Sequence, residues 1–449
     1  MLLMLTIPFI VIAAIEAGET AVLLGVVALA GVISLALVRD WWRRAYIVTL
    51  IAMVAGTTSF EAVGSVGGYV KIAAVGILAT VTLFTTRGPS QPIMGLHRLI
   101  IGTLWGTVAL AFASTLWSQF PTESALQAAM FAAFAFILHR TSTVRWIDRK
   151  VMAGDIGAAY VVMLLVIVVG FVLAFAGMEG AITWTGRHQG LLNNPNLLGM
   201  LAALALTLGI GYAAHRRSPA LWVSLLVPLA AIALSGSRTA LLATAVAGLW
   251  VILRSGFVRT TLIALAAVTV ALVMQASGAD PFGSTLERFT ANEGGDVLNK
   301  RSIVWDLVFH SLGTNPLGVG FGSTPDALDA VFSRGELEGG LSSVHNSYIQ
   351  MLYELGWVAV VVVVILVAAF IKIAVSSPVS GLGVGLVATV VVGAVIQITE
   401  SAIFGFGQPY PYLFWVAVLA AVVNSTQADK PAPVPRAKMR RRFAFSMRH

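Results

Sequence analysis

The chain has 449 residues, of which 58% are hydrophobic and only 11% are charged, and its mean hydropathy is +0.89. Soluble domains carry about 25% charged residues, so this composition excludes an ordinary water-soluble protein and favours a membrane protein. The formal charge is +8 and there is no cysteine, which excludes disulfides, thiolate zinc sites and a cysteine nucleophile.

Apolar segments follow one another closely and predict membrane-spanning helices, each of which needs about 20 apolar residues. The candidate spans are 2–15, 21–38, 45–60, 69–86, 99–117, 123–138, 151–177, 196–214, 219–234, 239–253, 260–276, 349–371, 380–398 and 409–424. We therefore predict an all-α, polytopic membrane domain over residues 1–424. Because several of these segments are short, the predicted number of transmembrane helices is 12–14. The first apolar segment lacks a preceding positive region and is interpreted as an anchor, not a cleaved signal peptide.

The basic residues predict the orientation of these spans. Alternate loops and the C-terminal tail hold 21 of the 28 Lys and Arg residues, whereas the loops at 16–20, 58–68, 118–122 and 399–408 hold none. The positive-inside rule assigns the basic loops to the cytoplasm. We therefore expect a multi-pass membrane protein with both termini in the cytoplasm.

Two segments depart from the pattern of short loops. Residues 277–348 form a polar stretch with nine acidic and four basic residues on the extracytoplasmic side, and loops of this length are usually lids or binding elements. We interpret it as an external cap that belongs to the membrane domain and contains helical fragments. Residues 425–449 are polybasic, and we expect a disordered cytoplasmic tail that contacts anionic membrane lipids.

The remaining basic residues fall on the predicted extracytoplasmic side, where few Lys and Arg residues are expected. A basic residue held there against the membrane therefore indicates a structural or functional role. They are Lys71, Arg187, Arg238, Arg288, Lys300, Arg301 and Arg334. Arg187 and Arg238 lie in short segments against span ends, and arginine binds phosphate oxygens with two parallel donors. Contact with lipid headgroups is the alternative for both. Near Arg187, Asn194 and Pro195 are expected to cap the next helix.

His345 lies where the cap re-enters the membrane, and an imidazole suits a general base near neutral pH. The alternative is a polar loop histidine beside a helix cap formed by Asn346 or Ser347. The Pro316–Gly322 segment lacks a preceding strand and a Lys-Ser/Thr pair, so we interpret it as a glycine-hinged turn and not as a nucleotide loop. No His, Asp or Glu residues have metal-ligand spacing.

These motifs together resemble the O-antigen ligase and O-antigen polymerase superfamily of bacterial membrane glycosyltransferases. The ordered set is Gly186-Arg187, Asn194-Pro195-Asn196, Ser237-Arg238, Arg288, Arg301 with Trp305, Asn315 to Gly322, His345-Asn346, and Glu354 with Gly356. The resemblance covers residues 180–360 in motifs and the whole chain in hydropathy. It implies a GT-C-like membrane enzyme with a large extracytoplasmic loop over its active site.

The resemblance also implies what the site does. The donor would be a glycan on undecaprenyl diphosphate, with no metal, nucleotide sugar or other cofactor and no nucleic-acid partner. Arg187 and Arg238 would hold the diphosphate and His345 would activate the acceptor hydroxyl. Arg288, Arg301, Asn346 and His188 complete the predicted substrate-binding set, although Arg288 and Arg301 could instead serve the structure of the cap.

This assignment agrees with the chemistry of the residues. A polyprenyl diphosphate is a good leaving group, so the transition state needs cations for the departing diphosphate and a base for the attacking hydroxyl. The acceptor could be a lipopolysaccharide core sugar, a growing polymer end, another component of the cell envelope or a protein, so ligase and polymerase stay open. A lipid-linked glycan flippase and a structural scaffold are the alternatives from other classes.

Overall fold

The computed structural model describes residues 40–255, 301–333 and 343–428, apart from 91, 94, 406 and 407. These residues form helices and connecting loops without a strand. The helices are α3 (Trp41–Ala55), α4 (Glu61–Thr85), α5 (Gly95–Ser114), α6 (Pro121–Thr143), α7 (Arg149–Phe175), α8 (Pro195–Arg216), α9 (Pro219–Ser224), α10 (Leu226–Ser235), α11 (Arg238–Ser255), α14 (Arg301–Thr314), α15 (Thr324–Ser333), α16 (Ser347–Leu355), α17 (Ala359–Ser376), α18 (Leu382–Thr399) and α19 (Pro409–Ala428), with 3₁₀ turns η1 (Arg145–Ile147) and η2 (Gly356–Val358).

The all-helical, polytopic fold predicted from the sequence is confirmed. In the described part of the chain, seven helical segments are long and apolar enough to cross a membrane. Every predicted span that lies within the described residues coincides with helix. The spans 2–15, 21–38 and 260–276 lie outside the described residues, so the total of 12–14 stays a prediction.

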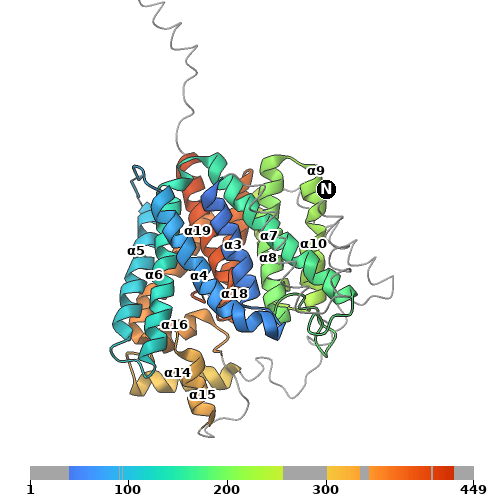
Figure 1. Cartoon of the computed structure of the whole chain (residues 1–449). Helices are drawn as coiled ribbons and strands as arrows, with labels where there is room; N and C mark the ends of the chain where they lie inside the picture. The colour runs from blue at the N-terminus through green and yellow to red at the C-terminus, as the bar shows by residue number, and fades with distance from the viewer. Residues whose placement is uncertain are drawn as a thin grey trace, which may run out of the picture.

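The helices pack into one bundle around α8 and α18 (Figure 1). Within the apolar windows of α8 and α18, 83% and 72% of the residues are buried, against 28% in α4 and 33% in the segment that contains α17. A Cβ atom on Gly385 would lie 2.4 Å from the Cα atom of Gly211, so only glycines allow this close approach of α8 and α18. Thr207 and Thr389 join the two helices by a hydroxyl hydrogen bond of 2.9 Å.

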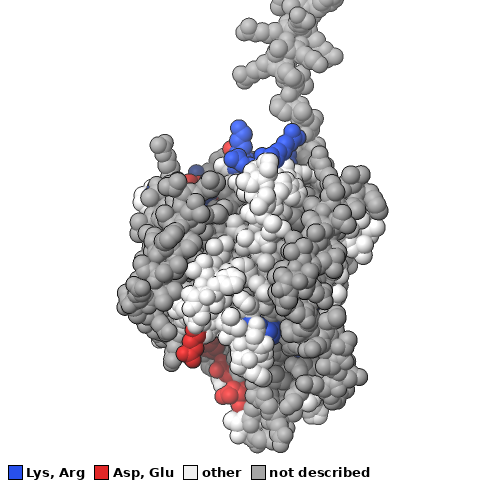
Figure 2. Space-filling model, turned by 90° about the vertical axis from the view of Figure 1, so that its right-hand side faces the viewer, with Lys and Arg blue, Asp and Glu red and all other residues white. Residues whose placement is uncertain are grey.

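Charges separate along the long axis of the bundle. One end, here called the basic end, contains the start of α7 and the ends of α6, α8, α11 and α17 with their Arg and Lys residues. The opposite end, here called the cap end, contains α14, α15 and the start of α16 (Figure 1). In Figure 2 most of the basic side chains in view lie at one end of the molecule and most of the acidic side chains at the other, with a further basic patch near the acidic end.

A buried ion-pair network fixes the helices at the basic end. The carboxylate of Asp155 on α7 accepts hydrogen bonds from Arg43 Nε at 2.8 Å, Arg145 Nε at 2.7 Å and Trp146 Nε1 at 3.1 Å. Arg145 also pairs with Asp40 and lies 4.2 Å from the centre of the Trp42 ring. The network therefore joins α3, η1 and α7.

Replacing Asp155 by alanine is expected to lower the free energy of unfolding by about 3–5 kcal/mol, because two partly buried arginines lose their shared, fully buried counter-ion. Thermal unfolding of the purified chain in one detergent measures the change. Asp148→Ala is the matched control, since Asp148 is exposed and caps α7 through the Lys150 amide, and a cap is worth about 1 kcal/mol. Equal losses in the two variants would contradict the role of the network.

Candidate active site

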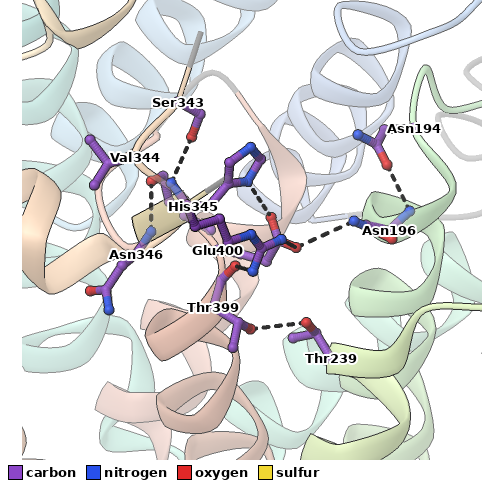
Figure 3. Close-up of polar contacts among 12 residues, drawn as sticks. Asn194, Asn196, Thr239, Ser343, Val344, His345, Asn346, Thr399 and Glu400 are labelled. Carbon is purple, nitrogen blue, oxygen red and sulfur yellow. Dashed lines mark hydrogen bonds and ion pairs between the residues drawn. The ribbon is translucent and has the colours of Figure 1, made fainter. Parts of the chain in front are cut away.

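A buried carboxylate at the cap end organises the candidate site. Glu400 follows α18 directly, in extended conformation, and its side chain is 10% exposed. One carboxylate oxygen, Oε2, lies 3.4 Å from His345 Nδ1. The other, Oε1, lies 3.5 Å from Arg301 Nη2 and accepts a hydrogen bond from Asn196 Nδ2 at 3.4 Å (Figure 3). Three segments distant in sequence therefore meet at this carboxylate.

Asn196 connects this carboxylate to Arg187. Its Oδ1 atom accepts a hydrogen bond from Arg187 Nη2 at 2.6 Å, while its Nδ2 atom faces Glu400. Asn196 lies in the first turn of α8, which begins where Asn194 caps the helix through the Asn196 amide at 2.8 Å and Pro195 occupies the first helical position. The predicted cap at Asn194 is confirmed.

Arg187 lies on the loop before α8, in a turn closed by Thr183. The Thr183 amide donates to the Arg187 carbonyl at 2.8 Å, and the Thr183 hydroxyl accepts from the Arg187 amide at 3.1 Å. The guanidinium donates through Nε to the carbonyl of Ser235 at 2.8 Å. Ser235 ends α10, so the arginine is fixed between α8 and the α10–α11 turn.

Arg238 begins α11 on that same turn, where Gly236 adopts a left-handed conformation at φ +58°. Residues on both sides of Arg238 form hydrogen bonds with residues of the site. The Ser235 carbonyl accepts from Arg187 Nε, and the Thr239 hydroxyl accepts from the Thr399 hydroxyl at 3.0 Å. Thr399 is the residue before Glu400. The structure therefore places the backbone of Arg238 beside the other site residues, with its side chain half-buried.

His345 precedes α16 in a strained backbone conformation, with φ at +52°. Such a conformation in a residue other than glycine costs on the order of 1–3 kcal/mol and persists only where the surroundings enforce it. Here Trp305 of α14 donates to the carbonyl of Val344 at 2.9 Å, and the His345 amide donates to Ser343 at 3.2 Å. The imidazole, 28% exposed, is thus fixed beside Glu400 while part of it faces solvent.

The residues after His345 attach α16 to α18. Asn346 caps α16, since its Oδ1 accepts from the amides of Tyr348 and Ile349 at 3.0 Å each, and its Nδ2 donates to the Ile398 carbonyl at 2.9 Å. The Ser347 hydroxyl bonds to Glu400 and Ala402 of the opposite segment. The side-chain oxygen and nitrogen of Asn346 therefore both bond to backbone groups. Asn346 thus caps α16 and fixes the position of the preceding residue, His345.

Arg301 begins α14 and also contacts the end of α18. Its Nη1 atom donates to the Thr399 carbonyl at 2.8 Å, and its Nη2 atom pairs with Glu400. This arginine therefore joins the cap to the membrane helices at the site itself. The predicted helical fragment from Arg301 to Leu312 is confirmed as α14.

The glycine-rich segment between α14 and α15 docks the cap on the bundle. Gly318, Gly320 and Gly322 all have positive φ, and the amides of Val319 and Gly320 donate to α16 carbonyls at 2.9 and 3.0 Å. Trp117 Nε1 donates to the Leu317 carbonyl at 3.0 Å. This segment consequently fixes α16, and with it His345, against α5 and α6.

Of the two remaining candidates, the structure describes only His188. The His188 ring packs against Phe171 and Phe175, and burial lowers the pKa of its imidazole. Its backbone amide donates to the carbonyl of Leu234 at 3.0 Å, so it supports the α10–α11 turn. Arg288 lies outside the described residues.

The sequence interpretation missed two members of the network, Glu400 and Asn196. Glu400 is an acidic residue directly after an apolar span, in a predicted extracytoplasmic loop without basic residues, which was the available signal. Asn196 was interpreted as part of a helix-capping segment. Within residues 40–255, 301–333 and 343–428, no three His, Asp or Glu side chains form a group that could hold a metal ion.

The arrangement suits an anionic substrate. Arg187 and Arg301 are connected with one carboxylate and one imidazole, so the formal charge of the group is positive, and Arg238 adds a further cation on the neighbouring α10–α11 turn. Guanidinium groups bind phosphate oxygens in pairs, and an imidazole whose Nδ1 faces a carboxylate presents Nε2 as a base. The group can therefore bind a phosphorylated ligand beside a hydroxyl that loses a proton.

The family model for O-antigen ligases matches residues 223–364 of the chain. The match contains Arg238, Arg301 and His345, while Arg187, Asn196 and Glu400 lie outside it. None of the curated proteins matches the chain closely enough to be counted as a relative. Residues 223–364 are therefore similar to the O-antigen ligase domain, which confirms the resemblance to the O-antigen ligase and polymerase superfamily and implies glycosyltransferase activity of that type.

Proposed function

We propose that the protein is an inverting, metal-independent glycosyltransferase that moves a glycan from polyprenyl diphosphate, undecaprenyl diphosphate in bacteria, to an acceptor hydroxyl. The observation that carries the proposal is a connected group at the cap end: Arg301 and His345 contact Glu400 directly, and Arg187 reaches it through Asn196. We assign this end to the extracytoplasmic face of a bacterial inner membrane and both termini to the cytoplasm.

The distribution of charge supports this orientation. The basic end carries the arginines of the short loops, and cytoplasmic loops are enriched in Arg and Lys. The cap end carries the exposed acidic residues Asp306, Asp326 and Asp329 of α14 and α15. A lipid-linked glycan whose diphosphate lies at the outer membrane surface would meet the arginines at that depth.

The proposed reaction is a single displacement. Arg187, Arg238 and Arg301 bind the diphosphate, whose negative charge grows as the bond from the anomeric carbon to the phosphate oxygen breaks. The acceptor oxygen forms its bond to the opposite face of that carbon, and His345 Nε2 accepts its proton. Polyprenyl diphosphate leaves with the electron pair of the broken bond, so the configuration at the anomeric carbon inverts.

The same chemistry serves a ligase and a polymerase. A ligase would present the hydroxyl of a lipopolysaccharide core, another envelope component or a protein, and a polymerase that of a second lipid-linked glycan. Surface glycans of a deletion strain distinguish the acceptors: unattached polymer indicates a ligase for a lipid or envelope acceptor, single repeat units indicate a polymerase, and unglycosylated protein indicates a protein acceptor.

The test uses the purified full chain in lipid nanodiscs with a polyprenyl-diphosphate oligosaccharide and an acceptor glycan, in the presence of a chelator. We expect product with an inverted anomeric centre, measured by NMR, and one polyprenyl diphosphate released per transfer. A retained anomeric configuration or a requirement for divalent metal would contradict the mechanism. Movement of the donor across vesicle membranes without any transfer would favour a transporter.

A further inference from the structure

A second candidate site lies at the basic end, on the side of the bundle. A cavity of about 510 Å³ is lined by Val161 of α7, by Tyr212, His215 and Arg216 of α8, and by Ser218 and Leu221. Its volume lies within the range of about 300–1,000 Å³ that is common for ligand pockets. Asn196 and Arg216 lie at opposite ends of α8, about 30 Å apart at 1.5 Å per residue, so the cavity is separate from the candidate active site.

The cavity results from the way in which α7 crosses α8. Figure 1 shows the two helices crossing obliquely, with α9 near the basic end. Glycines bring them close at the crossing, since a Cβ atom on Gly157 would lie 2.5 Å from the Tyr212 ring and one on Gly209 would lie 2.5 Å from the Tyr160 ring. The Tyr160 hydroxyl is 2.6 Å from that of Ser224 on α9. The three helices are thus fixed beside the cavity.

The lining has two chemical parts. Val161 and Leu221 provide apolar walls, and Val161 is 41% exposed on the surface of an apolar helix. His215 and Arg216 provide nitrogen donors at the last turn of α8, which is the end of a candidate membrane span. The lining has no carboxylate, and neither side chain forms a hydrogen bond or ion pair with another described residue.

We propose that this cavity binds an anionic glycerophospholipid. The lipid phosphate would contact Arg216 and His215 at headgroup depth, with one acyl chain along Val161 and Leu221. Basic pockets between helices on the cytoplasmic side of membrane proteins bind anionic headgroups, and arginine contacts phosphate oxygens with two donors. This site is distinct from the polybasic tail, and it does not depend on the proposed transfer reaction.

Native mass spectrometry of the full chain, titrated with phosphatidylglycerol or phosphatidylcholine, tests the proposal. Wild-type protein should bind phosphatidylglycerol more tightly than phosphatidylcholine, and Arg216→Gln should weaken phosphatidylglycerol binding about fivefold, as expected for one basic contact. Arg217→Gln is the matched control, because Arg217 is exposed beside Arg216 but does not line the cavity. It should leave binding unchanged.

A charge-neutral variant separates a shaped site from general surface attraction. Val161→Trp should fill part of the cavity and weaken phosphatidylglycerol binding as much as Arg216→Gln does, while thermal unfolding shows that each variant remains folded. Equal binding of the two lipids, equal losses in Arg216→Gln and Arg217→Gln, or unchanged binding by folded Val161→Trp would each overturn the proposal.

Discussion

Replacing His345 by glutamine is expected to lower kcat for glycan transfer by about 10²–10⁴-fold, which is the contribution of a positioned general base. Glutamine keeps a polar side chain of similar reach but cannot accept a proton at neutral pH. The KM for the lipid-linked donor should change little, because the proposed mechanism assigns binding of the donor diphosphate to the arginines. Steady-state transfer in nanodiscs measures both constants. His310→Gln, on the exposed surface of α14, is the matched control and should retain full activity.

The same prediction extends to Glu400 as a positioning residue. A carboxylate that accepts from Nδ1 keeps Nε2 as the base and stabilises the imidazolium that forms. In Glu400→Gln the amide can donate to Nδ1, which favours the wrong tautomer, so kcat should fall while KM for the acceptor stays nearly constant. Asp329→Asn, an exposed acid of α15, controls for the charge change. Full activity of folded His345→Gln would remove the base assignment, and full activity of folded Glu400→Gln would remove the positioning role.

The helices could be predicted from the sequence because apolar length and capping residues are local signals. The span predicted at 196–214 is α8, and its start follows from Asn194 and Pro195. The span at 219–234 is divided into α9 and α10 near Leu225. Pro228 explains the division, since proline is tolerated in the first turn of α10 but removes a hydrogen bond from the interior of a longer helix.

The candidate site could be predicted only in part. Arg187, Arg238 and His345 were found because extracytoplasmic cations and a histidine at a span end depart from the expected pattern. The connections among them depend on contacts between residues far apart in sequence: 204 positions separate Asn196 from Glu400, and 98 separate Arg301 from Thr399. Nothing in the local sequence indicates that α8 and α18 pack together at these ends.

Replacing Arg187 by alanine is expected to lower kcat by about 10²–10³-fold, the usual effect of removing one preorganised donor from a developing negative charge. Arg187→Lys should recover part of this loss, because lysine keeps the charge but lacks the planar fork that binds two phosphate oxygens. Transfer rates with saturating donor measure both variants. Lys71→Ala, a cation on α4 outside the network, is the control, and equal losses in this variant would indicate a general effect of surface charge.

Asn196 tests whether Arg187 and His345, the proposed diphosphate ligand and the proposed base, act as one unit. Its amide accepts from Arg187 and donates to Glu400, so loss of the amide in Asn196→Ala releases both side chains together. In a double-mutant cycle, Asn196→Ala and Glu400→Gln should therefore depart from additivity by more than about 0.5 kcal/mol, the limit for independent sites. Additive losses would mean that Arg187 and His345 are positioned separately. A coupled result would mean that donor binding at Arg187 and base orientation at His345 depend on the same hydrogen-bonded chain.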